Sequence, residues 1–581
     1  MTEARVTQAD RHQVRVDDLT VTGPRGRIVT GLDLAVEPGH CLAVVGESGS
    51  GKSMTAKAMT GLLPPAVTAT GTLSLGDRQI DLATDSRQLH RLRGTGIALL
   101  LQNPFTSLSP IHRCGDQIAA ALPAGRRTRE EVVQRLAEVN LPARVARQYP
   151  FHLSGGMRQR VAMAASLAPD PEVLIADEPT TALDVTTQRE VLDLLDRIRQ
   201  RRGMAVLLIT HDLGVAEERA DAITVMYAGR LMEGGPRDQV LSRPRHPYTA
   251  ALRDCDPPLD RRVERLPAIG GSAPRPWEVK QGCAFAARCP LADDHCRAEE
   301  PPLVEDPFPL RCWKPLTAGV DPIPLAPAIS GPPVDPDRVM LRVEGATRRF
   351  SADAPPALDG VDLTVAVGEA VGIVGESGSG KTTLARCLTG LERLDSGTVE
   401  WPLASAGGRR HDPRRAQIVF QDPFSALNPA MSVGAALAEA LRAGDRPRSE
   451  VPELLEMVGL PTSYAKRKPR ALSGGEQQRV AIARALAPGP DLLICDEAVS
   501  SLDVSVQAQI LNLLKALHAD LGLALLFITH DLAVVRQVTT RAYVMAQGRV
   551  VEQGDIDRLL DDPQDAYTRQ LFASVPGGGP R

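Results

Sequence analysis

Aromatic side chains are scarce in this sequence of 581 residues, making up only 3% of it. A surface that stacks the bases of single-stranded nucleic acid is therefore not expected. Charge of one sign is not in excess either, since 67 Lys and Arg residues stand against 71 Asp and Glu residues and leave a net charge of −4. No overall basic field would recruit nucleic acid, and we expect no nucleic-acid partner.

Long hydrophobic runs are also missing from the sequence. No apolar run approaches the roughly 18–20 residues of a membrane-spanning helix. The first residues contain no apolar stretch typical of a signal peptide. We therefore expect a protein that stays in the cytoplasm unless a partner holds it at a membrane. In that compartment the nine cysteines should be thiols or metal ligands rather than disulfides.

The sequence does contain a long internal repeat. GESGSGKS at 46–53 returns as GESGSGKT at 375–382, with the two lysines 329 positions apart. Four later features recur with an offset of 319: Gln102 and Gln421, Ser154 and Ser473, Asp177 and Asp496, His211 and His530. Short apolar strands lead into both glycine loops, and continuous apolar runs indicate parallel strands buried on both faces. We predict a duplicated α/β nucleotide-binding domain.

Composition suggests where the copies begin and end. We expect a first domain over 1–240 and a module rich in Pro, Arg and Cys over 241–316. Residues 317–338 hold six prolines and read as a semi-rigid linker. A second domain should follow over 339–560, with a tail over 561–581.

Both glycine loops have the pattern G-x-x-x-x-G-K-[ST], which binds phosphate. Its glycines let backbone N–H groups turn toward the phosphates at a helix N-terminus. Lys52 and Lys381 would reach the β- and γ-phosphates of ATP, and Ser53 and Thr382 would ligate Mg²⁺. The expected ATP contacts in the loops are Gly46, Glu47, Ser48, Gly49, Ser50, Gly51, Lys52 and Ser53, and Gly375, Glu376, Ser377, Gly378, Ser379, Gly380, Lys381, Thr382 and Thr383.

Each copy also carries an apolar strand that ends in two carboxylates, VLIADE at 173–178 and LLICDE at 492–497. The first carboxylate, Asp177 or Asp496, suits a contact to Mg²⁺ and its water. The second, Glu178 or Glu497, suits a general base for the attacking water. Acidic pairs at strand ends are often only solvated caps. Their place between a phosphate loop and a later histidine favours catalysis here.

The segments LSGGMRQR at 153–160 and LSGGEQQR at 472–479 carry the most specific signal. Here the chain resembles the ABC ATPase family, whose signature is LSGGQ. The resemblance implies two tandem P-loop ABC ATPase domains that form an intramolecular head-to-tail sandwich. Each signature would then close on the nucleotide of the other copy, through Ser154, Gly155 and Gly156 or through Ser473, Gly474 and Gly475.

The same resemblance implies further roles. His211 and His530 match the switch histidine, which contacts the γ-phosphate. Gln102 and Gln421 match the Q-loop glutamine, which links Mg²⁺ and the attacking water to a transmembrane partner.

Phe350 matches the family's adenine-stacking aromatic, whereas the aligned residue of the first copy is Gly23. We therefore expect weaker ATP binding at the first site unless another side chain covers the adenine, and tighter binding after Gly23→Tyr.

HPYTAALRD at 246–254, followed by four clustered cysteines, resembles the ATPase subunits of oligopeptide, dipeptide and nickel importers; DAYTRQLFASVP at 565–576 looks like a worn copy of the same tail. The resemblance implies peptide uptake, with nickel, a metallophore or another small solute as the alternative. It also implies two integral-membrane permease subunits, an extracytoplasmic solute-binding protein and a peripheral location at the cytoplasmic face of the plasma membrane. A soluble twin-cassette protein acting on ribosomes or DNA is the runner-up, although the Pro-rich linker disfavours it.

The clustered cysteines are Cys283, Cys289, Cys296 and Cys312. Four thiols so close together in a reducing compartment suggest a metal. Their spacings of five, six and fifteen residues include no C-x-x-C pair, which argues against an ordinary zinc ribbon. Some members of the resembling family carry a [4Fe–4S] cluster in this segment. We expect such a cluster, with zinc or no metal as the alternatives.

Overall fold

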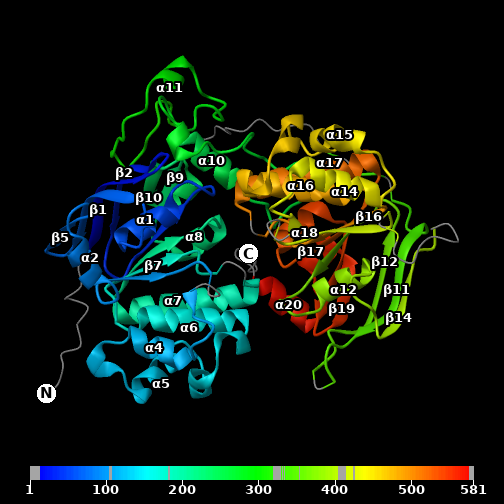
Figure 1. Cartoon of the computed structure of the whole chain (residues 1–581), viewed down its shortest axis with the longest axis horizontal. Coiled ribbons are helices and arrows are strands. Elements are labelled where there is room, and N and C mark those ends of the chain that lie inside the picture. Colours follow the sequence, from blue (N-terminus) through cyan, green and yellow to red (C-terminus); the bar gives the residue numbers. More distant parts are fainter. Residues whose placement is uncertain are drawn as a thin grey trace. The chain divides into compact units, whose positions relative to one another are not determined.

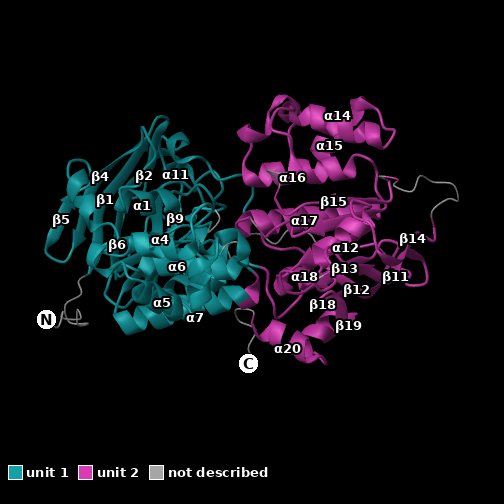
Figure 2. Ribbon diagram, turned by 60° about the horizontal axis from the view of Figure 1, so that its bottom comes forward, with its two compact units in different colours: residues 1–183, 187–256, 269–324 teal, residues 184–186, 257–268, 325–581 magenta. Residues whose placement is uncertain are grey.

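Contacts between residues divide the chain into two compact units in the computed structural model (Figure 2). Unit 1 comprises residues 1–183, 187–256 and 269–324; unit 2 comprises residues 184–186, 257–268 and 325–581. The structure describes residues 13–103, 107–180, 183–317, 329, 331–332, 334–352, 354–403, 412, 414–422, 426–500 and 502–574. Within these ranges, no helix is both long and apolar enough to cross a bilayer.

The larger sheet of unit 1 has six strands in the order β10, β9, β3, β8, β7, β6. All neighbours run parallel except β10 and β9. Every residue of β3, β7 and β8 is buried, as the apolar runs predicted. The strands are β3 (Cys41–Val45), β6 (Ile97–Leu100), β7 (Val173–Asp177), β8 (Ala205–Ile209), β9 (Ala222–Tyr227) and β10 (Arg230–Pro236).

An antiparallel sheet in the order β2, β1, β4, β5 packs beside it and shares its apolar core. Its strands are β1 (Val14–Gly23), β2 (Gly26–Val36), β4 (Thr68–Leu75) and β5 (Arg78–Asp81). Helices gather on the other side, around a second core (Figure 1). The helices of the nucleotide-binding part of unit 1 are α1 (Lys52–Met59), α2 (Ser86–Leu92), α4 (Cys114–Ala121), α5 (Arg129–Glu138), α6 (Gly155–Leu167), α7 (Val185–Arg202) and α8 (Leu213–Arg219).

The rest of unit 1 is a mostly irregular module. It contains the helices α9 (Arg237–Ser242), α10 (Pro247–Asp254) and α11 (Asp294–Ala298) and the short 3-10 helix η5 (Pro276–Glu278). A bridge between Glu233 and Leu310 joins the module to the edge strand β10.

Unit 2 repeats the architecture of unit 1. Its larger sheet has the order β15, β16, β17, β13, β18, β19, and its smaller sheet has the order β12, β11, β14. The strands are β11 (Val339–Arg348), β12 (Leu358–Ala366), β13 (Ala370–Val374), β14 (Ser396–Glu400), β15 (Ala416–Val419), β16 (Leu492–Asp496), β17 (Ala524–Thr529), β18 (Arg541–Ala546) and β19 (Arg549–Asp555). The helices are α12 (Lys381–Leu388), α14 (Val433–Ala443), α15 (Val451–Met457), α16 (Gly474–Leu486), α17 (Val504–Leu521), α18 (Leu532–Val538), α19 (Ile556–Asp561) and α20 (Ala566–Ala573). The predicted duplicated α/β fold is confirmed.

Two segments, 184–186 and the longer 257–268, belong to unit 2 although they lie between stretches of unit 1. We call residues 257–268 the strap. The amide of Asn512 on α17 donates to the Leu266 carbonyl at 2.8 Å and accepts from its N–H at 3.0 Å. Gln537 on α18 binds the strap backbone in the same two-way manner, donating to Pro258 and accepting from Val263.

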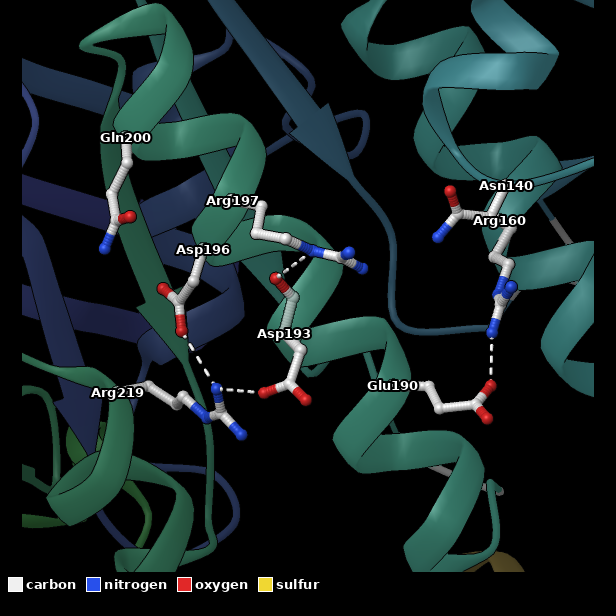
Figure 3. A pocket seen from close by; sticks show the side chains of 8 residues that line it. All are labelled: Asn140, Arg160, Glu190, Asp193, Asp196, Arg197, Gln200 and Arg219. Atoms are coloured by element: carbon white, nitrogen blue, oxygen red, sulfur yellow. Dashed lines mark hydrogen bonds and ion pairs between the residues drawn. The ribbon is translucent and has the colours of Figure 1, made fainter.

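Unit 1 carries an open groove on the corresponding face. The groove has a volume of about 710 Å³, and its acidic side chains are each bonded to arginines (Figure 3). Arg219 donates to Asp193 at 2.6 Å and to Asp196 at 3.1 Å, and Arg160 pairs with Glu190. Asp193 precedes Asn512 by the repeat offset of 319. The face that binds the strap in unit 2 is therefore lined by paired charges in unit 1.

Candidate functional site

The two phosphate loops have the same internal geometry. Each follows a buried strand, β3 or β13, and leads into a helix, α1 or α12. The ammonium of Lys52 donates to the carbonyls of Gly46 at 2.6 Å and Glu47 at 3.1 Å. That of Lys381 donates to Gly375 and Glu376, both at 2.7 Å. Each lysine is therefore folded along its own loop.

Glycine is required where each loop leaves its strand. Gly46 has a φ of 148°, and a Cβ placed on it would lie 2.1 Å from the Met226 carbonyl oxygen. Gly375 repeats this arrangement against Met545, at 2.2 Å. No side chain fits so close to a backbone oxygen, so these positions keep the loop next to the neighbouring strand. Further along the loops, Ser48, Gly49, Ser377 and Gly378 are exposed.

The expected magnesium ligands also meet. The hydroxyl of Ser53 donates to Asp177 Oδ1 at 3.0 Å, and that of Thr382 donates to Asp496 Oδ1 at 3.2 Å. Burial raises the pKa of both carboxyls, and repulsion from the neighbouring glutamate adds to the rise. A divalent cation bound between hydroxyl and carboxylate would offset that cost.

Each candidate general base lies between an amide and an imidazole. Gln102 Nε2 donates to Glu178 Oε2 at 2.7 Å, and His211 Nδ1 lies 3.2 Å from Glu178 Oε1. In unit 2, Gln421 and His530 hold Glu497 at 2.6 and 3.2 Å. Both glutamates have the uncommon left-handed backbone conformation, with φ of 47° and 51°. The sequence-predicted Gln, Glu and His thus come together twice, in a conformation that costs free energy and is typical of functional sites.

The pair in unit 2 is electrostatically coupled. Burial lowers the pKa of His530, but its hydrogen bond and attraction to Glu497 outweigh burial and raise that pKa above 6.5. Burial raises the pKa of Glu497, but the same contact with His530 outweighs it and leaves that pKa below 4.5. The charged pair is therefore favoured in the folded state.

This coupling predicts a pH-dependent stability. The raised pKa of His530 stabilises the fold below pH 6.5, and this contribution is lost as the pH rises through the folded pKa. The lowered pKa of Glu497 stabilises above pH 4.5 and is lost on acidification. His530→Asn should lower the free energy of unfolding by roughly 1 kcal/mol at pH 5.5 and by less at pH 9, as measured by urea denaturation without nucleotide. An equal loss at both pH values would contradict the coupling.

The signature segments form helix N-termini. Ser154 caps α6 by accepting from the N–H of Met157, and Ser473 caps α16 by accepting from that of Glu476. A Cβ on Gly156 would lie 2.4 Å from Thr187 Cγ2, and one on Gly475 would lie 2.5 Å from Val506 Cγ1. The second glycine of each signature therefore lets the next helix pack against it. A Cβ on Gly155 or Gly474 would meet only a leucine methyl group, at an ordinary contact distance of 3.6 or 4.0 Å.

The register of the small sheets shows which residue of unit 1 is equivalent to Phe350. Both first strands carry a bulge with a left-handed residue, Asp18 in β1 and Gly345 in β11, 327 positions apart. The same offset relates Gly23 to Phe350. Phe350 is 60% exposed, with the Arg348 guanidinium 5.0 Å from its ring centre.

Sequence reasoning missed how the tail segments support the loops. Tyr248 Oη on α10 accepts the N–H of Glu47 at 3.0 Å, and Tyr567 Oη on α20 accepts that of Glu376 at the same distance. The HPYT repeat was the available signal, but it gave no role for the tyrosine. The worn copy at 565–576 keeps this contact.

The first loop has a further support, from Arg288 in the module. Arg288 donates to both carboxylate oxygens of Glu47, at 2.6 and 3.0 Å, and to Tyr227 Oη at 3.0 Å. The Arg288 and Glu47 side chains are only 5% and 3% exposed. Attraction to Glu47 outweighs burial and raises the pKa of Arg288. Glu376 forms no such ion pair within the described part of unit 2.

The four clustered cysteines line one small pocket in the module, together with His246, Phe285 and Trp313. Burial raises the pKa of Cys283 to about 11 and that of Cys312 to about 12. Among the described residues, no three His, Cys, Asp or Glu side chains are grouped as a metal-ion site. The structure thus brings the four thiols to one place without arranging them around a single ion.

Comparisons with known proteins fit this geometry. A family model described as ABC transporter matches residues 29–181 and 358–500. A second, described as oligopeptide/dipeptide transporter, C-terminal region, matches residues 232–296 and 551–581. The chain is 40% identical to the oligopeptide transport ATP-binding protein OppD of Mycobacterium tuberculosis, over 98% of this chain and 99% of the relative. It is 39% identical to the glutathione import ATP-binding protein GsiA of Salmonella typhimurium, over 95% of this chain and 87% of the relative.

A solved structure resembles the whole chain. The archaeal ribosome recycling factor aABCE1, in complex with the ribosomal stalk protein aP1, matches 95% of this chain and 97% of its own with a TM-score of 0.55. The two sequences are 20% identical. At that identity the likeness concerns the fold alone.

Proposed function

Because the chain belongs to the ABC transporter family and carries two of its ATPase cassettes, we propose that it powers the import of short peptides. One observation carries the choice of peptides: a segment of the oligopeptide/dipeptide transporter type follows each cassette and supports its phosphate loop through a tyrosine. Two integral-membrane permease subunits would bind the chain at the cytoplasmic face of the membrane, and an extracytoplasmic binding protein would deliver the solute. Nickel, a metallophore or another small solute is the alternative cargo.

The residue roles follow from the contacts. Lys52 and Lys381 would leave their loop carbonyls for the β- and γ-phosphates of ATP. Ser53 with Asp177, and Thr382 with Asp496, would hold Mg²⁺, and Gln102 and Gln421 would be further ligands. Glu178 and Glu497 would each take a proton from the attacking water, and His211 and His530 would contact the γ-phosphate. Closure of each signature on the other copy's nucleotide would complete both sites.

Transport in a strain lacking the gene tests the proposal. The full chain should restore uptake of labelled di- to pentapeptides, and a variant carrying both Lys52→Ala and Lys381→Ala should not. Asp193→Asn, in the groove of unit 1, is a control that leaves the proposed ATP sites intact. Restored uptake of chelated nickel, but of no peptide, would overturn the peptide assignment and keep the importer.

We also propose a [4Fe–4S] cluster bound by Cys283, Cys289, Cys296 and Cys312. The donor set fits, because four thiols line one pocket and their burial penalises the free thiolate. The cluster would supply structural cross-linking of a module with little regular structure.

Anaerobically purified protein should be brown and carry about four irons per chain. Replacing any one of the four cysteines by Ser should bleach it and release the iron, because each thiolate ligates one corner of the cluster. Cys255→Ser is the matched control, since Cys255 is buried in the same unit but does not line the pocket. Colourless protein with one zinc would reject the cluster, and metal-free protein with four readily alkylated thiols would reject the metal site.

A further inference from the structure

The first candidate ATP site has a gap where the second has an aromatic ring. Gly23 ends β1 and pairs with Gly26 at the start of β2, so this hairpin turn carries no side chain at either position. A nucleotide on the first phosphate loop would find no ring there from its own cassette. An aromatic cover for the adenine would therefore have to come from outside this hairpin.

The 3-10 helix η5 brings an indole to this turn. A Cβ built on Gly26 would lie 2.9 Å from the Cβ of Trp277, so the base of the tryptophan side chain packs directly on the glycine that pairs with Gly23. The neighbouring Pro276 reaches Gly229, where a built Cβ would lie 3.2 Å from Pro276 Cβ. The Gly229 N–H in turn donates to the carbonyl of Ser50 in the phosphate loop, at 2.9 Å.

The surroundings of the indole match those of Phe350. Trp277 is partly exposed, and the Arg275 guanidinium lies 5.7 Å from its ring centre. The Arg348 guanidinium lies 5.0 Å from the ring of Phe350. Each ring is thus accompanied by an arginine two positions earlier in the chain. Each also belongs to a segment that borders the first hairpin of its unit.

We propose that Trp277 is the adenine-stacking residue of the first ATP site, supplied by the cysteine-containing module in place of the missing cassette aromatic. An indole presents a large π-face on which a purine stacks without sequence-specific hydrogen bonds. The role is specific to the base: it adds affinity for adenine and nothing for the triphosphate. The inference rests on the proposed ATP site of residues 46–53.

The test separates base from phosphate. In a full chain with Lys381→Ala, which disables the second site, Trp277→Ala should weaken ATP binding about tenfold. Binding of inorganic triphosphate should stay unchanged. Trp277→Phe should restore ATP binding because a phenyl ring still stacks. Gly23→Tyr should restore it in the Trp277→Ala background by returning the ring to the cassette. Trp401→Phe, in unit 2, is the control.

Tryptophan fluorescence gives a second readout. ATP should quench emission in the Lys381→Ala chain, and the quenching should vanish in Trp277→Phe but survive in Trp401→Phe. Equal loss of ATP and triphosphate binding in Trp277→Ala, or no loss of either, would overturn the role of Trp277. If Lys52→Ala in the same background also leaves ATP binding unchanged, the proposed phosphate site itself is wrong, which is a separate outcome.

Discussion

Replacing Glu178 and Glu497 together by glutamine should slow ATP turnover by about 10²- to 10⁴-fold, the usual contribution of a positioned general base. Each carboxylate is held by a glutamine amide at 2.6–2.7 Å and by an imidazole at 3.2 Å. A glutamine side chain has the same shape and can keep a contact with the imidazole. Its amide cannot accept the proton of water, so only the chemical step should suffer.

This prediction is tested by measuring both the steady-state ATPase activity and the equilibrium ATP binding of the variants. Binding should stay within a few-fold of the unchanged chain, and the single variants should fall between it and the double variant. Glu190→Gln serves as control, because Glu190 is a carboxylate of the groove in unit 1. Near-normal turnover in the double variant would show that neither residue acts as the general base.

Arg288→Met should destabilise unit 1 by about 3–5 kcal/mol. Methionine fills part of the space but leaves the carboxylate of Glu47 buried without its guanidinium, and breaking a buried pair from one side typically costs that much. Arg288→Lys should recover only part of the loss, because an ammonium cannot make the two parallel bonds to Glu47.

The double variant Arg288→Met with Glu47→Gln isolates the charge effect. It removes the unpaired carboxylate and should recover most of the lost stability in urea denaturation. Glu376→Gln is the matched change in the second loop and should alter stability little, because the described residues offer no ion pair to Glu376. An Arg288→Met chain as stable as the Glu376→Gln chain would show that the pair contributes nothing.

The parts of the site that were predictable are those whose residues lie close in sequence or recur with the repeat. A phosphate loop is defined by eight consecutive residues, and the carboxylates and histidines end buried apolar strands. Parallel strands bring such ends to one edge of a sheet, so their meeting followed from the pattern. The repeat gave each assignment a second time, at an offset of 329 for the phosphate loops and of 319 for the carboxylates and histidines.

The parts that were not predictable depend on contacts between distant positions. Arg288 lies 241 residues from Glu47. Nothing in the local sequence of either residue distinguishes an ion-paired arginine from a solvated one. The same holds for the strap, a Pro- and Arg-containing segment whose backbone is held by the side chains of Asn512 and Gln537. A side-chain amide that binds the backbone of a distant segment produces no repeating pattern in the sequence.

The strap affects the result of cutting this chain into two pieces. A cut within residues 317–338 looks like a clean separation of two ATPases, but the piece beginning near 339 would lack a segment of its own folded unit. The amides of Asn512 and Gln537 would lose the backbone groups that they bind. The first piece would carry the strap without its binding partners, and the second piece would keep the two amides that bind the strap. In the uncut chain the strap is captured at the high effective concentration of an intramolecular partner. Two separately made halves could therefore recognise each other through the strap, as a split protein does through complementary fragments.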